Sequence, residues 1–388
     1  MHFTKEEYKQ RLDKVKQGMI KQNIDLLILC HPANMNYLSG YDAWSFYVHQ
    51  FLLVSLESDE PVWIGREQDV ASAKFTTYLS EDNIIGYTDH YVQSTERHPA
   101  DFVAAYIRDK KLTARTIGVE SDSFYFTATT FLKLQSHLSG SKLVDSNNLV
   151  NWVRAIKSEA EISLMRQAGR IVELTMQKAI EMIKPGLRKC DLVAEIYKTQ
   201  IGGIPEYAGD YPAIVPLIPS GEKTSACHLT WDDSQFENNQ LMFMELGGCR
   251  LRYHCPLSRT VYIGDPPKDV LNAESALING IPEALAAAKA GNTCEDVETA
   301  WKNVLRKFGL EKDTRLGYSI GLNYPPDWGE QTMSLRPGDK TVLQENMCFH
   351  LMPGLWFDKW GMEISEPFIV KKDGGEPFCN FPRKLFVK

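Results

Sequence analysis

The sequence has no excess of basic residues and no long apolar run. It contains 43 Lys and Arg against 50 Asp and Glu, which gives a formal net charge of −7. This balance argues against nucleic acid as a partner, because phosphate binding requires a basic surface. No apolar run approaches the roughly 18 residues that a membrane-spanning helix needs, so we expect no membrane partner either.

The eight cysteines form no CxxC pair, and the polar N-terminus lacks the apolar core of a secretory signal. Scattered cysteines in a chain of this length are typical of reduced thiols rather than of a disulfide framework. The sequence therefore predicts a cytoplasmic protein. Its 388 residues, 43% of them hydrophobic, are enough for two domains with well-filled cores.

The first part of the chain alternates predicted strands with predicted helices. Short apolar runs typical of buried strands occupy residues 25–30, 51–56, 61–65 and 116–121. Helical spacing of apolar residues marks residues 3–22 and 100–111. This alternation predicts an α/β N-terminal domain over residues 1–152.

From residue 153 onward the pattern changes. Ser158 and Glu161 fit a capping box at the start of a long amphipathic helix that ends at 185–186, a Pro-Gly pair. Residues 244–264, MELGGCRLRYHCPLSRTVYIG, are expected to form two strands joined by a Gly-Gly turn. Hairpin strands with helices packed on one side predict an α+β catalytic domain over residues 153–388. The further helices of this domain are expected at 189–200, 270–290 and 294–308.

Five motifs in one order resemble the pita-bread fold of the creatinase, prolidase and methionine aminopeptidase superfamily. They are VRAIKSEAEISLMRQAG (153–169), the strand pair around Glu245, RTVYIG (259–264), GYSIGLNYPP (317–326) and GMEISEPFIV (361–370). The resemblance covers essentially the whole chain. It implies a creatinase-type N-terminal domain followed by a pita-bread catalytic domain.

The metallopeptidases of this superfamily hold two metal ions with two Asp, one His and two Glu. At the corresponding positions this sequence has Glu245, Pro256, Tyr318, Met352 and Ser365, and the last is flanked by Glu363 and Glu366. Proline and methionine cannot usefully ligate a hard divalent cation. We therefore expect no metal and no other cofactor, and we do not expect peptidase activity.

Four stretches closely resemble the ectoine hydrolases, a metal-free branch of the superfamily. They are residues 34–50, 227–233, 252–261 and 317–330. Ectoine is a small zwitterion whose ring carries an amidinium and a carboxylate. The resemblance implies metal-independent hydrolysis of a ring C–N bond to give N-acetyl-L-2,4-diaminobutyrate. Two alternatives remain open: a creatinase-like amidinohydrolase acting on another guanidinium or amidinium compound, and an inactive pita-bread protein that binds partners.

Glu245 is the expected carboxylate that acts on the amidinium carbon, because an acid within an apolar strand must be paired or functional. The alternative is a structural salt bridge to one of the nearby arginines at positions 250, 252 and 259. His228, where creatinase-like members keep a functional His, is expected to transfer protons, although it could be a solvated loop residue. Glu363 is the second carboxylate candidate. It could equally be an exposed strand acid.

Other polar side chains of the second half are less favoured. His254 and His350 read as core or interface histidines, and Arg259 is left unassigned as a binder of the substrate carboxylate.

Aromatic residues in two turn-rich segments could enclose the delocalised cation. The expected substrate-binding residues are Trp44, Phe46, Tyr47, Tyr318, Tyr324 and Trp328. Core packing is the more usual role of each one taken singly. By resemblance to creatinase-like dimers, we expect a homodimer in which the N-terminal loop 42–50 completes the site of the partner.

Overall fold

The computed structural model describes residues 2–112 and 114–388, and the chain divides into two compact units. The first unit ends at Arg154, and the second covers Ala155–Lys388. Among the helices of the described residues, none has both the length and the apolar character of a membrane span.

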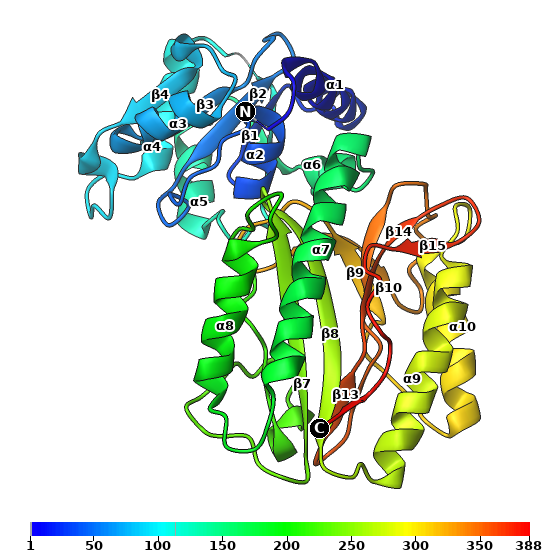
Figure 1. The fold of residues 1–388 in the computed structure, drawn as a ribbon. Coiled ribbons are helices and arrows are strands. Elements are labelled where there is room, and N and C mark those ends of the chain that lie inside the picture. Colours follow the sequence, from blue (N-terminus) through cyan, green and yellow to red (C-terminus); the bar gives the residue numbers. More distant parts are fainter. Residues whose placement is uncertain (1, 113) are drawn as a thin grey trace. The chain divides into compact units, whose positions relative to one another are not determined.

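The first unit contains one mixed six-stranded sheet with the strand order β4-β3-β2-β1-β5-β6 (Figure 1). Its strands are β1 (Leu26–Leu29), β2 (Phe51–Ser55), β3 (Val62–Arg66), β4 (Ile84–Tyr87), β5 (Thr116–Val119) and β6 (Lys142–Asp145). Strand β2 runs antiparallel to both of its neighbours, whereas the other pairs are parallel. The α/β class expected for this half is confirmed.

Helices cover this sheet. They are α1 (Lys5–Gln22), α2 (Pro32–Ser39), α3 (Val70–Thr76), α4 (Pro99–Asp109), α5 (Ala128–His137) and α6 (Leu149–Arg154), with short 3-10 turns at Glu67–Asp69, Glu81–Asn83 and Asp89–Tyr91. Apolar side chains of α4 and α5, such as Val103, Ile107 and Leu134, pack against Ile28 and Ile117 of the central strands. This burial of apolar side chains holds α4 and α5 against the sheet.

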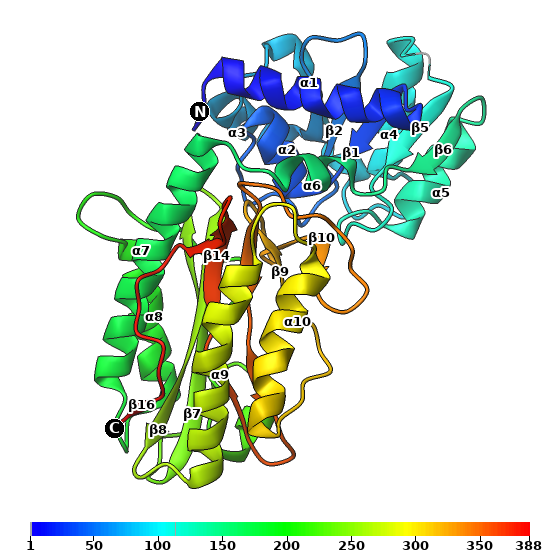
Figure 2. The same cartoon turned by 90° about the vertical axis from the view of Figure 1, so that its right-hand side faces the viewer.

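Four long helices frame the second unit: α7 (Glu159–Met182), α8 (Lys189–Gly202), α9 (Lys268–Ala287) and α10 (Cys294–Leu305). Helix α7 begins at the predicted capping box. The Glu161 carboxylate accepts from the Ser158 backbone N–H at 2.9 Å, and the Ser158 hydroxyl accepts from the Glu161 N–H at 3.3 Å. Figures 1 and 2 show that α7 lies beside α8 and that α9 lies beside α10. Shorter 3-10 turns lie at Gly221–Ser225 and Arg306–Phe308.

The strands of the second unit form a long hairpin and a five-stranded sheet. The hairpin joins β7 (Gln240–Arg250) to β8 (Tyr253–Ile263), and β16 (Phe386–Val387) extends it. The sheet has the order β10-β9-β11-β14-β15, and its strands are β9 (Gly317–Ile320), β10 (Gly329–Leu335), β11 (Cys348–Leu351), β14 (Glu366–Val370) and β15 (Gly375–Pro377). Strands β12 (Gly354–Trp356) and β13 (Gly361–Glu363) form a separate short ladder.

The Gly-Gly turn expected between β7 and β8 was wrong. Strand β7 passes straight through Gly247 and Gly248, and the chain reverses at residues 251–252, whose φ angles are 48° and 68°. A Cβ at Gly248 would overlap the carbonyl oxygen of Ala168 in α7, and one at Gly247 would lie 2.8 Å from the Trp328 ring. The two glycines therefore allow close packing on both faces of a strand rather than a turn.

Candidate active site

Three titratable side chains from different strands converge in the second unit. Glu245 comes from β7, His350 from β11 and Glu363 from β13, and all three are buried. Their ligand atoms lie within 4.8 Å of one another. The His350 Nδ1 atom is 3.8 Å from a carboxylate oxygen of Glu245. We refer to these residues as the Glu–His–Glu cluster.

Within the part of the chain that the structure describes, the Glu245 carboxylate has no ion pair with an arginine. The arginines considered as partners bond elsewhere, and Arg259, for example, reaches Glu366 at 2.6 Å. Among the described residues, no side chain donates a hydrogen bond to Glu245. Burial raises the pKa of this carboxyl group well above its usual value, and the nearby charges of Glu363 and Asp327 raise it further.

Glu363 is fixed through its backbone, while its carboxylate stays available. Its N–H donates to the Thr260 hydroxyl at 2.9 Å, and that hydroxyl donates to the Glu363 carbonyl at 2.7 Å. The carboxylate oxygen Oε1 is buried and has no hydrogen-bond partner among the described residues. Burial raises the pKa of Glu363 to about 7, against the opposing charge of Lys312. A buried acceptor without a hydrogen bond costs on the order of 1–3 kcal/mol. A bound ligand that donates a hydrogen bond to this oxygen would remove that cost.

His350 is held in place by hydrogen bonds at both ring nitrogens. Its Nε2 lies 2.8 Å from the Ser365 hydroxyl, which accepts the Ser258 N–H at 2.7 Å. Its Nδ1 lies 3.3 Å from the Tyr318 hydroxyl and 3.8 Å from a carboxylate oxygen of Glu245. Burial lowers the pKa of His350 to about 3, which keeps the ring neutral, with one nitrogen that donates and one that accepts.

The aromatic candidates of the second unit separate into two groups. The Trp328 N–H donates to the Tyr318 hydroxyl at 2.8 Å, and that hydroxyl contacts His350, so Tyr318 and Trp328 border the cluster. Both rings are buried. Tyr324 is also buried, but its ring lies against the Arg252 guanidinium at 5.8 Å. Of the three, two are brought to the cluster.

The other expected histidines lie outside the cluster. His228 is exposed on the loop before β7, although its neighbour Cys227 has a thiol pKa that burial and the charges of Glu363 and Glu245 raise. That loop therefore passes close to the cluster. His254 is buried, accepts the Ala213 N–H at 2.8 Å and has its pKa lowered to about 3 by burial.

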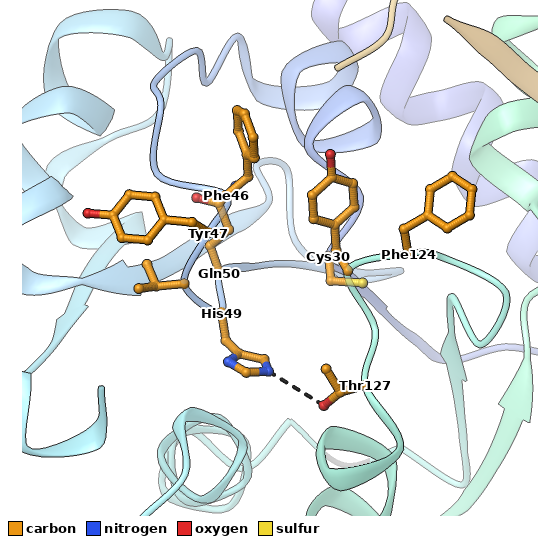
Figure 3. Close-up of a pocket in the computed structure, with 9 residues that line it drawn as sticks. Cys30, Phe46, Tyr47, His49, Gln50, Phe124 and Thr127 are labelled. Atoms are coloured by element: carbon orange, nitrogen blue, oxygen red, sulfur yellow. Dashed lines mark hydrogen bonds between the residues drawn. The ribbon is translucent and has the colours of Figure 1, made fainter. Parts of the chain in front are cut away.

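The N-terminal aromatic residues lie in the first unit. Trp44 and Tyr47 are 58% and 64% exposed, and the Trp44 ring packs on Phe46 with centroids 4.7 Å apart. Phe46 and Tyr47 line a cavity of about 180 Å³. Figure 3 shows these two rings on one side of it and His49 with Thr127 on another. Cys30, Gln50, Phe124 and Tyr125 also line this cavity.

Sequence reasoning missed two charged residues beside the cluster. Lys312 is 6% exposed and donates to the Gly354 carbonyl at 2.7 Å. It lies in GLEKDTRLG (309–317), a charge-rich stretch typical of an exposed loop, so the sequence gives little signal of its burial. Asp327 follows a Pro-Pro pair and accepts the Gly329 N–H at 2.8 Å, and burial raises its pKa.

The donor set does not fit a site for two metal ions. Within the described residues, the Glu–His–Glu cluster is the one group of three or more His, Cys, Asp and Glu that could hold an ion. Pro256 and Met352 offer no hard ligand, and the hydroxyls of Tyr318 and Ser365 bond to side chains of the protein. Three donor residues fall short of the two Asp, one His and two Glu that the dinuclear sites of the superfamily use.

Comparison with known proteins agrees with this architecture. Residues 163–372 match the metallopeptidase family M24, and residues 11–156 match the creatinase/prolidase N-terminal domain. Solved structures with the same fold include an X-Pro aminopeptidase from Thermotoga maritima and a prolidase from Pyrococcus horikoshii OT3. Each has a TM-score of 0.81 and 22% identity, covering 97% of this chain and 99% of the other. The expected two-part fold is confirmed.

Curated relatives match over the full length. The chain is 48% identical to a protein from Halomonas elongata named ectoine hydrolase, covering 100% of this chain and 98% of that one. It is 46% identical to an uncharacterized hydrolase/peptidase of Sinorhizobium fredii, covering 100% and 99%. A Xaa-Pro dipeptidase from Pyrococcus furiosus is 23% identical, covering 97% and 99%. The expected resemblance to ectoine hydrolases is confirmed.

Proposed function

The chain is a hydrolase of metallopeptidase family M24 with a creatinase/prolidase N-terminal domain, and from that premise we propose that it hydrolyses ectoine. The product of this ring opening is N-acetyl-L-2,4-diaminobutyrate. Full-length identity of 48% to the Halomonas elongata protein supports the substrate.

One observation carries the proposal: two buried carboxylates lie close together and receive no hydrogen bond from a side chain of the described residues. Glu245 and Glu363 lie within the same 4.8 Å cluster. An amidinium offers N–H groups at both ends of a delocalised positive charge, so each carboxylate can accept one N–H. A bound cation would thus relieve both the repulsion between the acids and their missing hydrogen bonds.

We assign Glu245 the chemical step at the amidinium carbon. It either adds to that carbon directly or takes a proton from the attacking water. A proton then reaches the departing ring nitrogen and the C–N bond breaks. Where water attacked, the carbon keeps the water oxygen as an acetamide. Where Glu245 added, an imidate ester on Glu245 remains, and a water molecule then attacks its carbon, releases the Glu245 carboxylate and leaves the acetamide. His228, on its exposed loop, exchanges this proton with solvent. The buried neutral His350 is suited to donate a hydrogen bond rather than to accept a proton.

The proposal is tested by incubating EDTA-treated protein with ectoine, hydroxyectoine or creatine and following products by mass spectrometry. Metal-independent ring opening of ectoine is the expected result. Activity that EDTA removes and a divalent cation restores would show that the Glu–His–Glu cluster works with an ion. Turnover of creatine instead would favour an amidinohydrolase, and turnover of none of the three would favour a binding protein.

The role of Glu245 is tested with the variant Glu245→Gln, which keeps the shape of the side chain and removes its charge. We expect it to abolish turnover while the protein melts at an unchanged or higher temperature. A near-normal rate in this variant would contradict the role given to Glu245.

We also propose a homodimer in which Trp44, Phe46 and Tyr47 of one subunit complete the partner's site. The high exposure of Trp44 and Tyr47 supports it, because large apolar rings clustered at a surface often mark an interface. Co-expressing a Trp44→Ala/Tyr47→Ala chain with a Glu245→Gln chain should restore roughly a quarter of wild-type activity, since half of the dimers carry one intact site. No restoration in verified mixed dimers would place the loop in its own subunit's site.

A further inference from the structure

We propose that Lys312 binds the carboxylate of the zwitterionic substrate and thereby selects it over cyclic amidines that lack a carboxylate. This inference rests on the proposed function. Two acids suit the amidinium, but a zwitterion also needs a cation for its negative group. Lys312 is the buried cation beside the Glu–His–Glu cluster.

The fold places the Lys312 ammonium next to the strand that presents Glu363. Its Nζ donates to the carbonyl of Gly354 at 2.7 Å, and Gly354 is directly paired with Glu363 in the β12–β13 ladder. A Cβ at Gly354 would lie 3.4 Å from Glu363 Cγ, so the missing side chain and the Glu363 side chain share one face. The Trp356 ring fills the space at Gly354, since a Cβ there would lie 2.8 Å from it. The contribution of Gly354 is its carbonyl, which anchors the lysine opposite Glu363 in the ladder.

The ammonium has donors that the protein does not use. An ammonium carries three N–H groups, and within the described residues Lys312 makes one hydrogen bond and no ion pair. Burial lowers the pKa of Lys312 to about 8, against the opposing charge of Glu363. A buried ammonium without an ion-pair partner is unfavourable, and an anionic ligand would supply that partner.

The order of charges in the site matches that in ectoine. In ectoine the carboxylate is attached to the ring carbon next to an amidine nitrogen, so its anion lies next to its cation. In the protein, Lys312 lies next to Glu363 without forming an ion pair with it. Glu363 can therefore take the amidinium N–H while Lys312 takes the carboxylate.

Other cations near the cluster are less suitable. Arg259 is paired with Glu366 at 2.6 Å. Arg315 is exposed, lies over the Tyr318 ring at 4.3 Å and donates to Ser334 at 3.3 Å. Because Arg315 is the nearest rival, it provides the matched comparison variant.

The test compares ectoine with 2-methyl-1,4,5,6-tetrahydropyrimidine, the same ring without the carboxylate. Lys312→Met keeps the apolar stem and removes the charge. It should lower kcat/KM for ectoine roughly 100-fold more than kcat/KM for the carboxylate-free ring, the size expected for one charge-assisted contact. The loss of the Lys312 charge beside Glu363 affects both substrates alike, so the ratio of the two values reports the carboxylate contact. Lys312→Arg should retain the preference for ectoine, and Arg315→Met should not alter it.

Equal losses on both substrates in Lys312→Met would overturn the inference, because the residue would then serve catalysis or folding. A loss of activity on ectoine alone in Arg315→Met would also overturn the inference, because Arg315 would then bind the carboxylate. If Lys312→Met does not fold, as judged by circular dichroism, wild-type protein with no preference between the two rings overturns it instead. Failure of the proposed function is separate: wild-type protein would then turn over neither ring, and both proposals would fall.

Discussion

Glu363 and Glu366 are three residues apart, and both are buried, but their surroundings are opposite. Glu366, in β14, pairs with Arg259 at 2.6 Å and with Arg383 at 3.1 Å. Glu363, at the end of β13, has a carboxylate oxygen without any partner among the described residues. Between them lies Ser365, which bonds to His350. The second Glu366 oxygen, Oε2, also lacks a hydrogen-bond partner. The two acids therefore differ in charge pairing: Glu366 is paired with two arginines, whereas Glu363 has no ion pair among the described residues.

This difference separates a structural acid from a functional one better than burial does. A fold gains nothing from a buried carboxylate that it does not pair, because the cost of desolvation is not offset. Such a group persists when a ligand pairs with it. On this reasoning Glu245 and Glu363 bind the substrate, and Glu366 has a structural role in joining β14 to Arg259 of β8.

The largest expected effect is on catalysis. Glu363→Gln should lower kcat/KM for ectoine by at least about 100-fold, because a neutral amide cannot balance the amidinium charge. Its melting temperature should not fall. Steady-state kinetics with circular dichroism measures both quantities, and a variant that loses stability together with activity would make Glu363 a structural acid like Glu366.

The second prediction is the reverse case. Glu366→Gln leaves the buried Arg259 guanidinium without its carboxylate, so the free energy of unfolding should drop by about 3–5 kcal/mol. Urea unfolding followed by fluorescence measures this loss. The fraction that remains folded should retain kcat within about threefold, and a specific loss of kcat in stable Glu366→Gln protein would remove the distinction between the two acids.

The third prediction concerns pH. The proposed mechanism needs Glu245 and Glu363 ionised, and burial raises the pKa of both, that of Glu363 to about 7. The value of kcat/KM for ectoine should therefore fall by at least tenfold per pH unit below about 7. Lys312, whose pKa is lowered to about 8, loses its charge above that value and gives an alkaline limb. Lys312→Arg should move this limb upward, because arginine stays charged. An alkaline limb that does not move in that variant would belong to another group.

The fold could largely be predicted from local patterns. The capping box at Ser158 and the apolar periodicity after it located α7, because both signals depend on residues close in the chain. The Gly-Gly pair at 247–248 misled because its cause lies elsewhere in the chain, in the close approach of α7 and Trp328. Strand β6 gave no apolar signal, because its side chains are only partly buried.

The site could be predicted only in part for the same reason. Glu245 stood out as an acid in an apolar strand, which is a local signal. His350 and Lys312 did not, because their roles depend on Ser365 and on Gly354, which distant segments bring next to them. Whether a buried polar group is satisfied is a property of three-dimensional contacts, and no spacing in the sequence reports it.

The smallest expected effect tests whether the two unsatisfied acids repel each other in the folded protein. Burial raises the pKa of Glu363 above its value in an unfolded chain, so this residue lowers stability as pH rises from about 4.5 to 7. Glu363→Gln should therefore raise the free energy of unfolding by about 1–3 kcal/mol at pH 8 and by much less at pH 5. Adding Glu245→Gln should then gain about 1 kcal/mol less than it does alone, because the repulsion has already been removed. Urea unfolding of the two single variants and the double variant at both pH values measures this coupling. Strictly additive gains at pH 8 would mean that the two carboxylates do not repel each other. That result would contradict a single cation bound between them.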